Sequence, residues 1–464
     1  MSVVPLPAVE EPPRTAVPFG EALKFWLKLG FISFGGPAGQ IAIMHRELVE
    51  QKRWISERRF LHALNYCMVL PGPEAQQLAT YIGWLMHRTW GGIVAGGLFV
   101  LPSLFILVAL SWVYVVFGEV DWVAGLFYGI KPAVAAIVLH AVWRIGSRTL
   151  KSPRKVPLLW AVALASFACI AWLKVPFPIV VGAAALIGAA GGRYAPGQFA
   201  AGGAHGSASA GAPAGHRSLR ALIDDDTPTP EHALFRKARL AQVAVVGAAL
   251  WIAPMALLAT THGLHGTLAQ MGWFFTKAAL LTFGGAYAVL PYVYQGAVEQ
   301  FQWLTGAQMI DGLALGETTP GPLIMIVAFV GFVGGWTKQV LGPDALFAGA
   351  ALAATVVTWF TFLPSFLFIL AGGPLVESTH GDLRFTAPLT AITAAVVGVI
   401  ASLALFFLVH IALARHPLGL PVDAVALALA LAAAVALLRF KAGVIPVIAS
   451  CALVGMVLRL AGPA

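Results

Sequence analysis

The chain has few charged residues. Asp, Glu, Lys and Arg make up only 11% of its 464 residues, whereas soluble proteins carry about 25%. Apolar residues account for 59% of the sequence, and the mean hydropathy is +0.84. Apolar runs long enough to cross a bilayer recur as far as the C-terminal end. This composition excludes an ordinary water-soluble domain and predicts a multi-pass membrane protein with the lipid bilayer as its surroundings.

Other signals are missing as well. The ten-residue alternation of a transmembrane β-barrel is absent, which favours an all-α polytopic fold. No basic stripe with interleaved aromatic residues occurs, so the net charge of +9 does not indicate a nucleic-acid partner. We assign that charge to Lys and Arg in cytoplasmic loops.

Sequence signatures of catalysis and metal binding are also lacking. The three cysteines, Cys67, Cys169 and Cys451, lie in apolar stretches without metal-ligand spacing and are interpreted as small buried hydrophobes. There is no EF-hand, P-loop or HExxH pattern. We therefore expect no cofactor, no metal and no enzymatic activity. Residues 1–20 lack the basic and apolar regions of a cleaved signal, which predicts a disordered N-terminal cap.

What the chain does have is an internal repeat. A constant offset of 249 residues relates Lys28 to Lys277, Phe34-Gly35-Gly36 to Phe283-Gly284-Gly285, Trp54 to Trp303, and Pro71-Gly72-Pro73 to Pro320-Gly321-Pro322. With a shifted offset the match continues through Leu101-Pro102-Ser103 and Leu363-Pro364-Ser365. Paired apolar segments interrupted by Gly and Pro indicate a transporter whose site lies between two repeats.

The repeat defines the predicted domain plan. We expect a cap at 1–20, a first repeat at 21–191, a flexible cytoplasmic linker at 192–235, a connecting transmembrane helix at 236–263 and a second repeat at 264–464. The single connecting helix would turn the second repeat upside down. Loop charge agrees, because 46–59 holds five Lys or Arg residues and its counterpart 295–308 holds none. The prediction is two homologous repeats of inverted topology.

The basic stretch 144–155 constrains the crossings. Three simple crossings would place it on the opposite side from 46–59, although both are basic. The conflict disappears if the segment containing Pro71-Gly72-Pro73 enters and returns, as two half-helices that meet at the break. Re-entrant backbone is tolerated where protein or a water-filled cavity covers it. The alternative is a Pro-kinked helix that spans the membrane.

The two Gly-Gly pairs and the two Pro-Gly-Pro sequences each break a helix, and together these four breaks form the candidate site. A half-helix that starts at such a break presents free N–H groups and a positive dipole end, which suit an anion. Glycine pairs let a ligand approach the backbone, and hydroxyls and amides add donors. The predicted anion-binding residues are Ser33, Gly35, Gly36, Pro37, Gln40, Asn65, Pro71, Gly72, Pro73 and Gln76 in the first copy, and Thr282, Gly284, Gly285, Thr318, Thr319, Pro320, Gly321 and Pro322 in the second. Close helix packing by small residues is the alternative.

Four charged residues accompany the breaks. Lys28 and Lys277 lie one to two turns before the Gly-Gly pairs and either face the anion or extend to an interface. Glu74 and Glu317 flank the Pro-Gly-Pro breaks, and a carboxyl group at that depth can carry protons. Glu74 can instead cap the half-helix that follows it, which would be a structural role.

These residues resemble a known family. The pattern Phe34-Gly-Gly-Pro37-Ala-Gly39, the stretch Gln51-Lys-Arg-Trp-Ile55, Leu70-Pro-Gly-Pro73-x-x-Gln76 and the second set of breaks are similar to the chromate ion transporter (CHR) family in its long, two-domain form. The resemblance implies a secondary transporter that exports chromate across the bacterial inner membrane on the proton-motive force and gives chromate resistance. The second copy departs from the pattern, with Ala286 at the position of Pro37 and Leu323 at that of Glu74.

The substrate, the coupling and the oligomeric state stay open at this point. Chromate is a tetrahedral dianion close in shape to sulfate, so a sulfate or other oxyanion transporter or channel is the alternative, and a membrane scaffold without transport is a further one. Proton antiport would add to the driving force of the membrane potential, and a homodimer is compatible with the sequence.

Overall fold

The computed structural model describes residues 17–34, 36–199, 221–224, 227, 230–283, 285–378, 386–413 and 422–461. Within these ranges every named element is helical, and the one β contact is an isolated bridge between Ile55 and Ile223. Among the described residues, seven helices are long and apolar enough to cross a membrane. The prediction of an all-α polytopic membrane protein is confirmed. Gly35, Gly284 and residues 1–16 of the predicted cap lie outside the described residues.

The first repeat and the segment after it contain short helices followed by long ones. They are α1 (Phe19–Ile32), α2 (Gly36–His45), the π-helix η1 (Arg46–Gln51), α3 (Glu57–Val69), α4 (Glu74–Phe117), α5 (Asp121–Thr149), α6 (Pro157–Ala171), α7 (Phe177–Tyr194), α8 (Pro196–Phe199) and η2 (Glu231–Ala233).

The connecting helix α9 (Lys237–His262) leads into the second repeat. Its elements are α10 (Thr267–Leu280), α11 (Ala286–Tyr294), the π-helix η3 (Gln295–Gln300), α12 (Gly306–Thr318), η4 (Leu323–Met325), α13 (Ile326–Thr337), η5 (Pro343–Ala345), α14 (Leu346–Ser378), α15 (Thr386–Ala412), α16 (Ala424–Leu438) and α17 (Val444–Ala461).

The sequence repeat is also a backbone repeat. The π-helices η1 and η3 begin and end 249 residues apart. Each is followed by a residue of positive φ, Arg53 at 52° and Gln302 at 51°. Tryptophan N–H groups close both turns in the same way, Trp54 onto Leu48 and Trp303 onto Ala297, each at 2.8 Å. The two copies therefore share local geometry wherever the constant offset holds.

The first half-helix pair forms a hairpin. Glu21 at the start of α1 pairs with Lys52 after η1 at 3.9 Å, and Lys28 pairs with Glu47 at 3.5 Å. The rings of Phe25 and Trp54 meet with their centroids 5.1 Å apart. These contacts run antiparallel, so α1 leads to the break and α2 with η1 returns beside it.

The Pro71-Gly72-Pro73 segment forms a second hairpin. Helix α4 is interrupted at His87 and Arg88, and its two arms fold against each other, with Gly83 against Gly91. The start of α3 and the end of the first arm of α4 contact the same short piece of chain. Ser56 N–H donates to Ile223 (2.9 Å), and His232 Nε2 bonds the carbonyl of Trp84 (2.9 Å). The helices on the two sides of the break are thus interrupted and fold back, and their re-entry into the membrane stays a prediction.

The docked piece belongs to the segment predicted as a flexible linker. Residues 221–223 run beside 53–56, and Arg59 Nη2 donates to the carbonyl of Thr227 at 3.1 Å. Burial lowers the pKa of His232, which disfavours the protonated imidazole. Helix α7 extends to Tyr194, three residues beyond the expected boundary of the first repeat.

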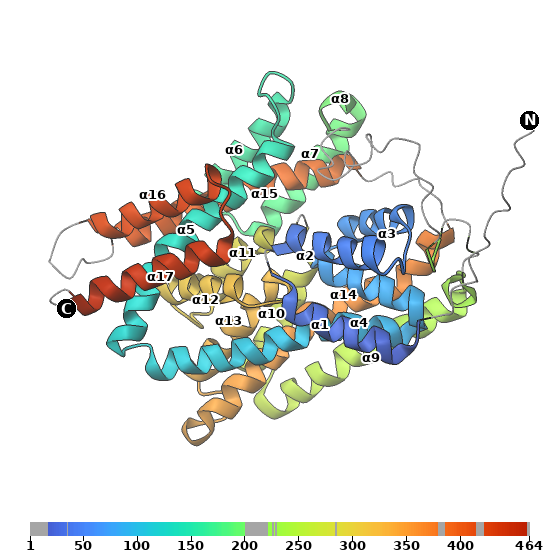
Figure 1. The fold of residues 1–464 in the computed structure, drawn as a ribbon, viewed down its shortest axis with the longest axis horizontal. Coiled ribbons are helices and arrows are strands. Elements are labelled where there is room, and N and C mark those ends of the chain that lie inside the picture. The colour runs from blue at the N-terminus through green and yellow to red at the C-terminus, as the bar shows by residue number, and fades with distance from the viewer. Residues whose placement is uncertain are drawn as a thin grey trace, which may run out of the picture.

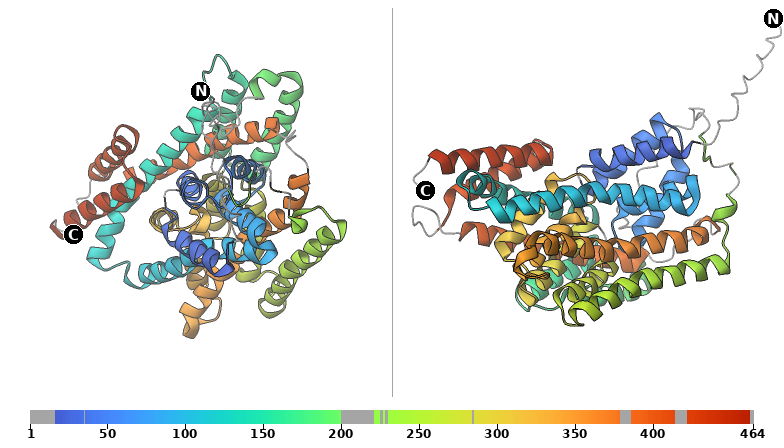
Figure 2. Two further views of the ribbon diagram at one scale, coloured as in Figure 1. Left: turned by 45° about the vertical axis from the view of Figure 1, so that its right-hand side comes forward. Right: turned by 90° about the horizontal axis from the view of Figure 1, so that it is seen from below.

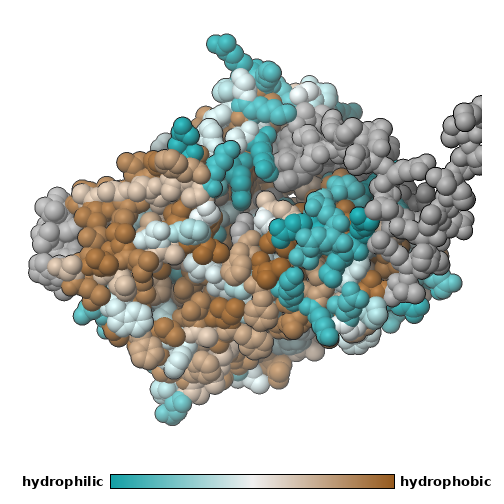
Figure 3. All heavy atoms as spheres, in the orientation of Figure 1, coloured by the Kyte–Doolittle hydropathy of each residue, from teal (hydrophilic) through white to brown (hydrophobic). Residues whose placement is uncertain are grey.

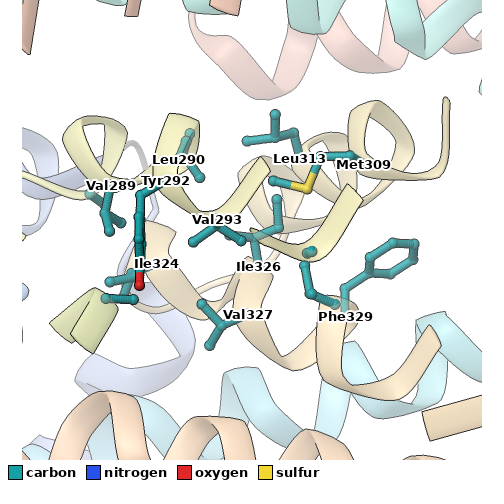
Figure 4. Packing of buried hydrophobic residues seen from close by; sticks show 14 of the residues in the cluster. Val289, Leu290, Tyr292, Val293, Met309, Leu313, Ile324, Ile326, Val327 and Phe329 are labelled. Carbon is teal, nitrogen blue, oxygen red and sulfur yellow. The ribbon is translucent and has the colours of Figure 1, made fainter. Parts of the chain in front are cut away.

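The helices are spread along one long axis. In Figure 1 and in the right-hand view of Figure 2, α1–α3 lie toward one end of the long axis and α16 and α17 toward the other. The second arm of α4 and helix α14 run antiparallel, because Gly96 lies by Phe366 while Trp112 meets Phe347. The largest buried apolar cluster joins α10–α15, and Figure 4 shows part of it.

The outer surface suits lipid. The face shown in Figure 3 is hydrophobic over most of the area of α16 and α17, and a hydrophilic area lies where Figure 1 places α2 and α3. Large apolar side chains such as Leu186 on α7 and Val245 on α9 are exposed. In a water-soluble monomer so much exposed apolar surface would be exceptional.

Candidate functional site

The four breaks meet at one junction through crossed backbone hydrogen bonds. The N–H group of Gly72 in the first copy donates to the carbonyl of Thr282 in the second at 2.8 Å. The N–H group of Gly321 in the second copy donates to the carbonyl of Ser33 in the first, also at 2.8 Å. Gly72 corresponds to Gly321 and Ser33 to Thr282 at the offset of 249, so the two bonds are equivalent. Such reciprocal contacts are typical of a local two-fold relation. Each Pro-Gly-Pro break thus pairs with the Gly-Gly break of the other copy.

Two serines complete the junction. A Cβ atom at Gly72 would meet the hydroxyl of Ser365, and a Cβ atom at Gly321 would lie 2.9 Å from Cβ of Ser103. The φ angles of Gly72 and Gly321 are 126° and 103°, a region that side chains rarely occupy. Glycine is therefore required twice over, for backbone conformation and for space. The site prediction omitted both serines, although the repeated Leu-Pro-Ser sequence carried the signal.

Helix starts surround the junction. Helices α2, α4 and α11 begin directly after a break, and η4 leads into α13 after the fourth break. First-turn N–H groups lack partners within their own helix and carry the positive end of its dipole. Gly36 and Gly285 have φ of 71° and 97°, and a Cβ on either would meet no atom within 4 Å. The backbone is thus open to an approaching ligand at equivalent points of the two copies.

The hydroxyl groups near the breaks already have acceptors. Ser33 donates to Leu29 and Thr282 to Ala278, each at 2.7 Å, again 249 residues apart. Thr318 and Thr319 likewise donate to carbonyls one turn back in α12. In this structure their protons bond their own helices, which leaves the backbone N–H groups at the breaks as the predicted donors for an anion.

Glutamine side chains brace the first-copy breaks. Gln40 Nε2 donates across the copies to the carbonyl of Gly321 at 2.5 Å. Gln76 Nε2 donates to Thr80 Oγ1 at 3.0 Å, which leaves its Oε1 buried without a partner among the described residues. Gln77, which the site prediction missed, donates to the carbonyl of Pro71 at 2.8 Å. The break at Gly72 is therefore held by side chains as well as by backbone.

The second copy is apolar at the equivalent positions. Val289 corresponds to Gln40, Leu323 to Glu74 and Ile326 to Gln77. Figure 4 shows Val289 and Ile326 among packed apolar side chains of the second copy. The two-fold relation is thus one of backbone only, and the polar side chains of the junction come mainly from the first copy.

Three predicted site residues lie away from this junction. Lys28 is exposed and pairs with Glu47, and Lys277 is exposed with its Nζ 5.8 Å from the ring centroid of Trp273. Asn65 is exposed on α3. Both lysines thus take the exposed arrangement that the sequence left open as an alternative.

The two glutamates have different surroundings. Glu74 is the first residue of α4, is 9% exposed, and has no hydrogen-bond or ion-pair partner among the described residues. Glu317, at the end of α12, is 8% exposed and accepts a hydrogen bond from the hydroxyl of Tyr287. Glu74 is therefore the carboxyl group that is free to exchange a partner.

Fold and junction together define the class. A polytopic helical protein in which broken helices of two repeats meet at a shared junction has the architecture of many membrane transporters. Residues 20–189 and 269–456, in both halves, match the chromate transporter family. The chain belongs to that family.

Individual relatives agree. The chain is 35% identical to a chromate transport protein of Pseudomonas aeruginosa over 81% of this chain and 77% of that protein. It is 30% identical to a chromate transport protein of Cupriavidus metallidurans over 94% and 92% of the two chains. A probable chromate transport protein of Synechococcus elongatus is 28% identical over 82% and 81%. No solved structure matches this one.

Proposed function

We propose that the protein is a secondary transporter, not an enzyme, that exports chromate across the bacterial inner membrane and so gives chromate resistance. The observation that carries the proposal is the crossed junction, where helix starts from both copies surround backbone that is open at Gly36 and Gly285. Positive helix ends favour an anion there. The chromate transport proteins among the relatives narrow that anion to chromate.

The charge of the ion supports this direction. With the cell interior negative, moving a dianion outward is favourable by about 4.6 kcal/mol per 100 mV. We propose that proton antiport adds to this driving force, with Glu74 as the proton carrier and Glu317 as the second candidate. Glu74 supports this role because it is buried at the junction without a fixed partner among the described residues.

We further propose that the repeats have inverted topology in the membrane. Helix α9, with 26 residues, is about 39 Å long and can carry the chain from the linker to the opposite face. The second arm of α4 and α14 carry the repeated Leu-Pro-Ser sequence and run antiparallel. In this topology the 46–59 loop of the first copy faces the cytoplasm, and the 295–308 loop of the second copy faces the periplasm.

Cysteine labelling tests this topology. Gln51 and Gln300 are equivalent, exposed residues at the ends of η1 and η3. In a cysteine-free background, Gln51→Cys should react with an impermeant maleimide only from the cytoplasmic face and Gln300→Cys only from the periplasmic face. Reaction of both from one face would rule out the inversion.

Ion flux tests the function. Purified protein in proteoliposomes should move chromate when a potential and a pH gradient are imposed, and excess sulfate or molybdate should inhibit it less than unlabelled chromate. Preferred sulfate flux would support the alternative, a sulfate or other oxyanion transporter. If the flux does not depend on the pH gradient and the protein conducts ions as a channel, an oxyanion channel would be supported.

A further inference from the structure

Two buried ionic clusters lie outside the junction. In the first, Arg59 Nη1 on α3 meets Glu377 Oε2 near the end of α14 at 2.5 Å, and the hydroxyl of Tyr81 donates to Glu377 Oε1 at 2.5 Å. The Glu377 side chain is 2% exposed. This cluster joins a hairpin of the first copy to the long helix of the second.

The second cluster has the same chemistry with the copies exchanged. Asp311 on α12 pairs with Lys131 Nζ on α5 at 3.5 Å and accepts a hydrogen bond from the hydroxyl of Tyr114 on α4 at 2.9 Å. Its side chain is 4% exposed. The residues are not repeat equivalents, since Arg59 corresponds to Gln308. Each cluster nevertheless combines a carboxylate, a cation and a tyrosine between a hairpin of one copy and long helices of the other.

The clusters lie on either side of the junction. On α4, Tyr114 is eleven residues beyond Ser103, or about 16 Å. On α14, Glu377 is twelve residues beyond Ser365, or about 18 Å. Because these two helices are antiparallel, the displacements point in opposite directions. Along these helices, one cluster therefore lies toward each end of the protein from the junction.

Buried ion pairs favour discrete states, because separating the partners leaves uncompensated charge in a medium that solvates it poorly. We propose that the two clusters are latches that close the two ends of the transport path and open alternately. The linker-end latch is Arg59, Glu377 and Tyr81, and the far-end latch is Asp311, Lys131 and Tyr114. The inference rests on the proposed function, because it takes the junction to be a point on the path of a transported ion.

The linker braces one latch. Arg59 donates through Nη2 to the carbonyl of Thr227 while Nη1 holds Glu377. The ion pairs of both latches are formed in this structure, so under this proposal it represents a state with both ends closed. Opening the linker-end latch requires α3 and α14 to separate, and opening the far-end latch requires α12 to leave α4 and α5.

A cysteine between the latches tests the proposal. Ser103 is 1% exposed and lies beside Gly321, so Ser103→Cys in a background without Cys67, Cys169 and Cys451 reports access to the junction. Labelling with an impermeant maleimide is compared in right-side-out and inside-out vesicles. Glu377→Gln should speed labelling from the face of the 46–59 loop about tenfold and slow it from the other face, since coupling of this kind is typically 5–150-fold. Asp311→Asn should do the reverse.

Two sets of variants control for folding and for charge. Asp121→Asn removes a carboxylate from an exposed pair with Arg459 (3.7 Å) and should leave labelling unchanged. Tyr81→Phe and Tyr114→Phe keep the ion pairs, and each should shift labelling in the same direction as its latch partner by a smaller factor. If Glu377→Gln or Asp311→Asn fails to reach the membrane, the two Tyr→Phe variants test the latches in its place.

Equal changes from both faces, or no change in any latch variant, would overturn the latches. Chromate flux is measured in matching vesicles, which carry the same latch variants without the Ser103→Cys reporter. Opposite shifts in labelling without any chromate flux in the parent protein would keep the latches and reject the proposed function. Chromate flux in the parent protein, together with labelling that does not change in the latch variants, would keep the proposed function and reject the latches.

Discussion

Gly72→Ala and Gly321→Ala are each expected to cost most of the chromate transport. Both glycines have φ above 100° and donate a crossed bond, and an added methyl group would press on Ser365 or Ser103. Backbone strain of about 1–3 kcal/mol corresponds to about a 5- to 150-fold loss if it falls on the transport-competent state. Chromate flux in inverted vesicles measures the loss, normalised to the amount of protein in the membrane.

The matched control for these variants is Gly97→Ala. Gly97 is helical within α4, the helix that follows the Gly72 break, and a Cβ there would meet no atom within 4 Å, so transport should stay at the level of the parent protein. Full activity of Gly72→Ala and Gly321→Ala would show that the crossed bonds are dispensable. A comparable loss in Gly97→Ala would mean that any added methyl group on α4 is harmful.

Glu74→Gln should uncouple transport from the pH gradient. The substitution keeps the size of the side chain and removes the group that can exchange a proton at the start of α4. Flux driven by the membrane potential should persist, because the dianion still moves down the electrical gradient. The measurement is chromate flux in proteoliposomes with the pH gradient and the potential imposed separately.

Glu317→Gln provides the comparison for that result. Glu317 has a fixed partner in Tyr287, and its loss should leave the dependence on the pH gradient in place. If the dependence survives in Glu74→Gln and disappears in Glu317→Gln, the proton passes through the second copy. If Glu74→Gln instead fails to fold, the residue serves as the helix cap.

The repeat made the breaks predictable. A constant offset showed which Gly and Pro residues correspond, and Pro-Gly-Pro forces a helix to stop wherever it occurs. Loop charge then favoured a hairpin at Pro71-Gly72-Pro73 over a third crossing. These inferences needed only local chemistry and counting, which a single sequence contains.

The contacts between the two copies could not be predicted from the sequence. The offset reveals that Gly72 corresponds to Gly321, but nothing in it shows that Gly72 bonds Thr282. The same limit hid the pairing of Arg59 with Glu377, since the two residues are 318 positions apart and have no charged counterparts in the other copy. The sequence also did not show that the hydroxyls of Ser33 and Thr282 each donate to a carbonyl one turn back in their own helix.

The central claim is that both copies build one junction, and division of the chain within 201–220 tests it most directly. The two pieces are produced separately and together, and chromate flux is measured in vesicles with matched amounts of each. The crossed bonds of Gly72 and Gly321 predict no flux from either piece alone and recovery when both are present. Flux from one piece alone at the rate of the intact chain would contradict a shared junction.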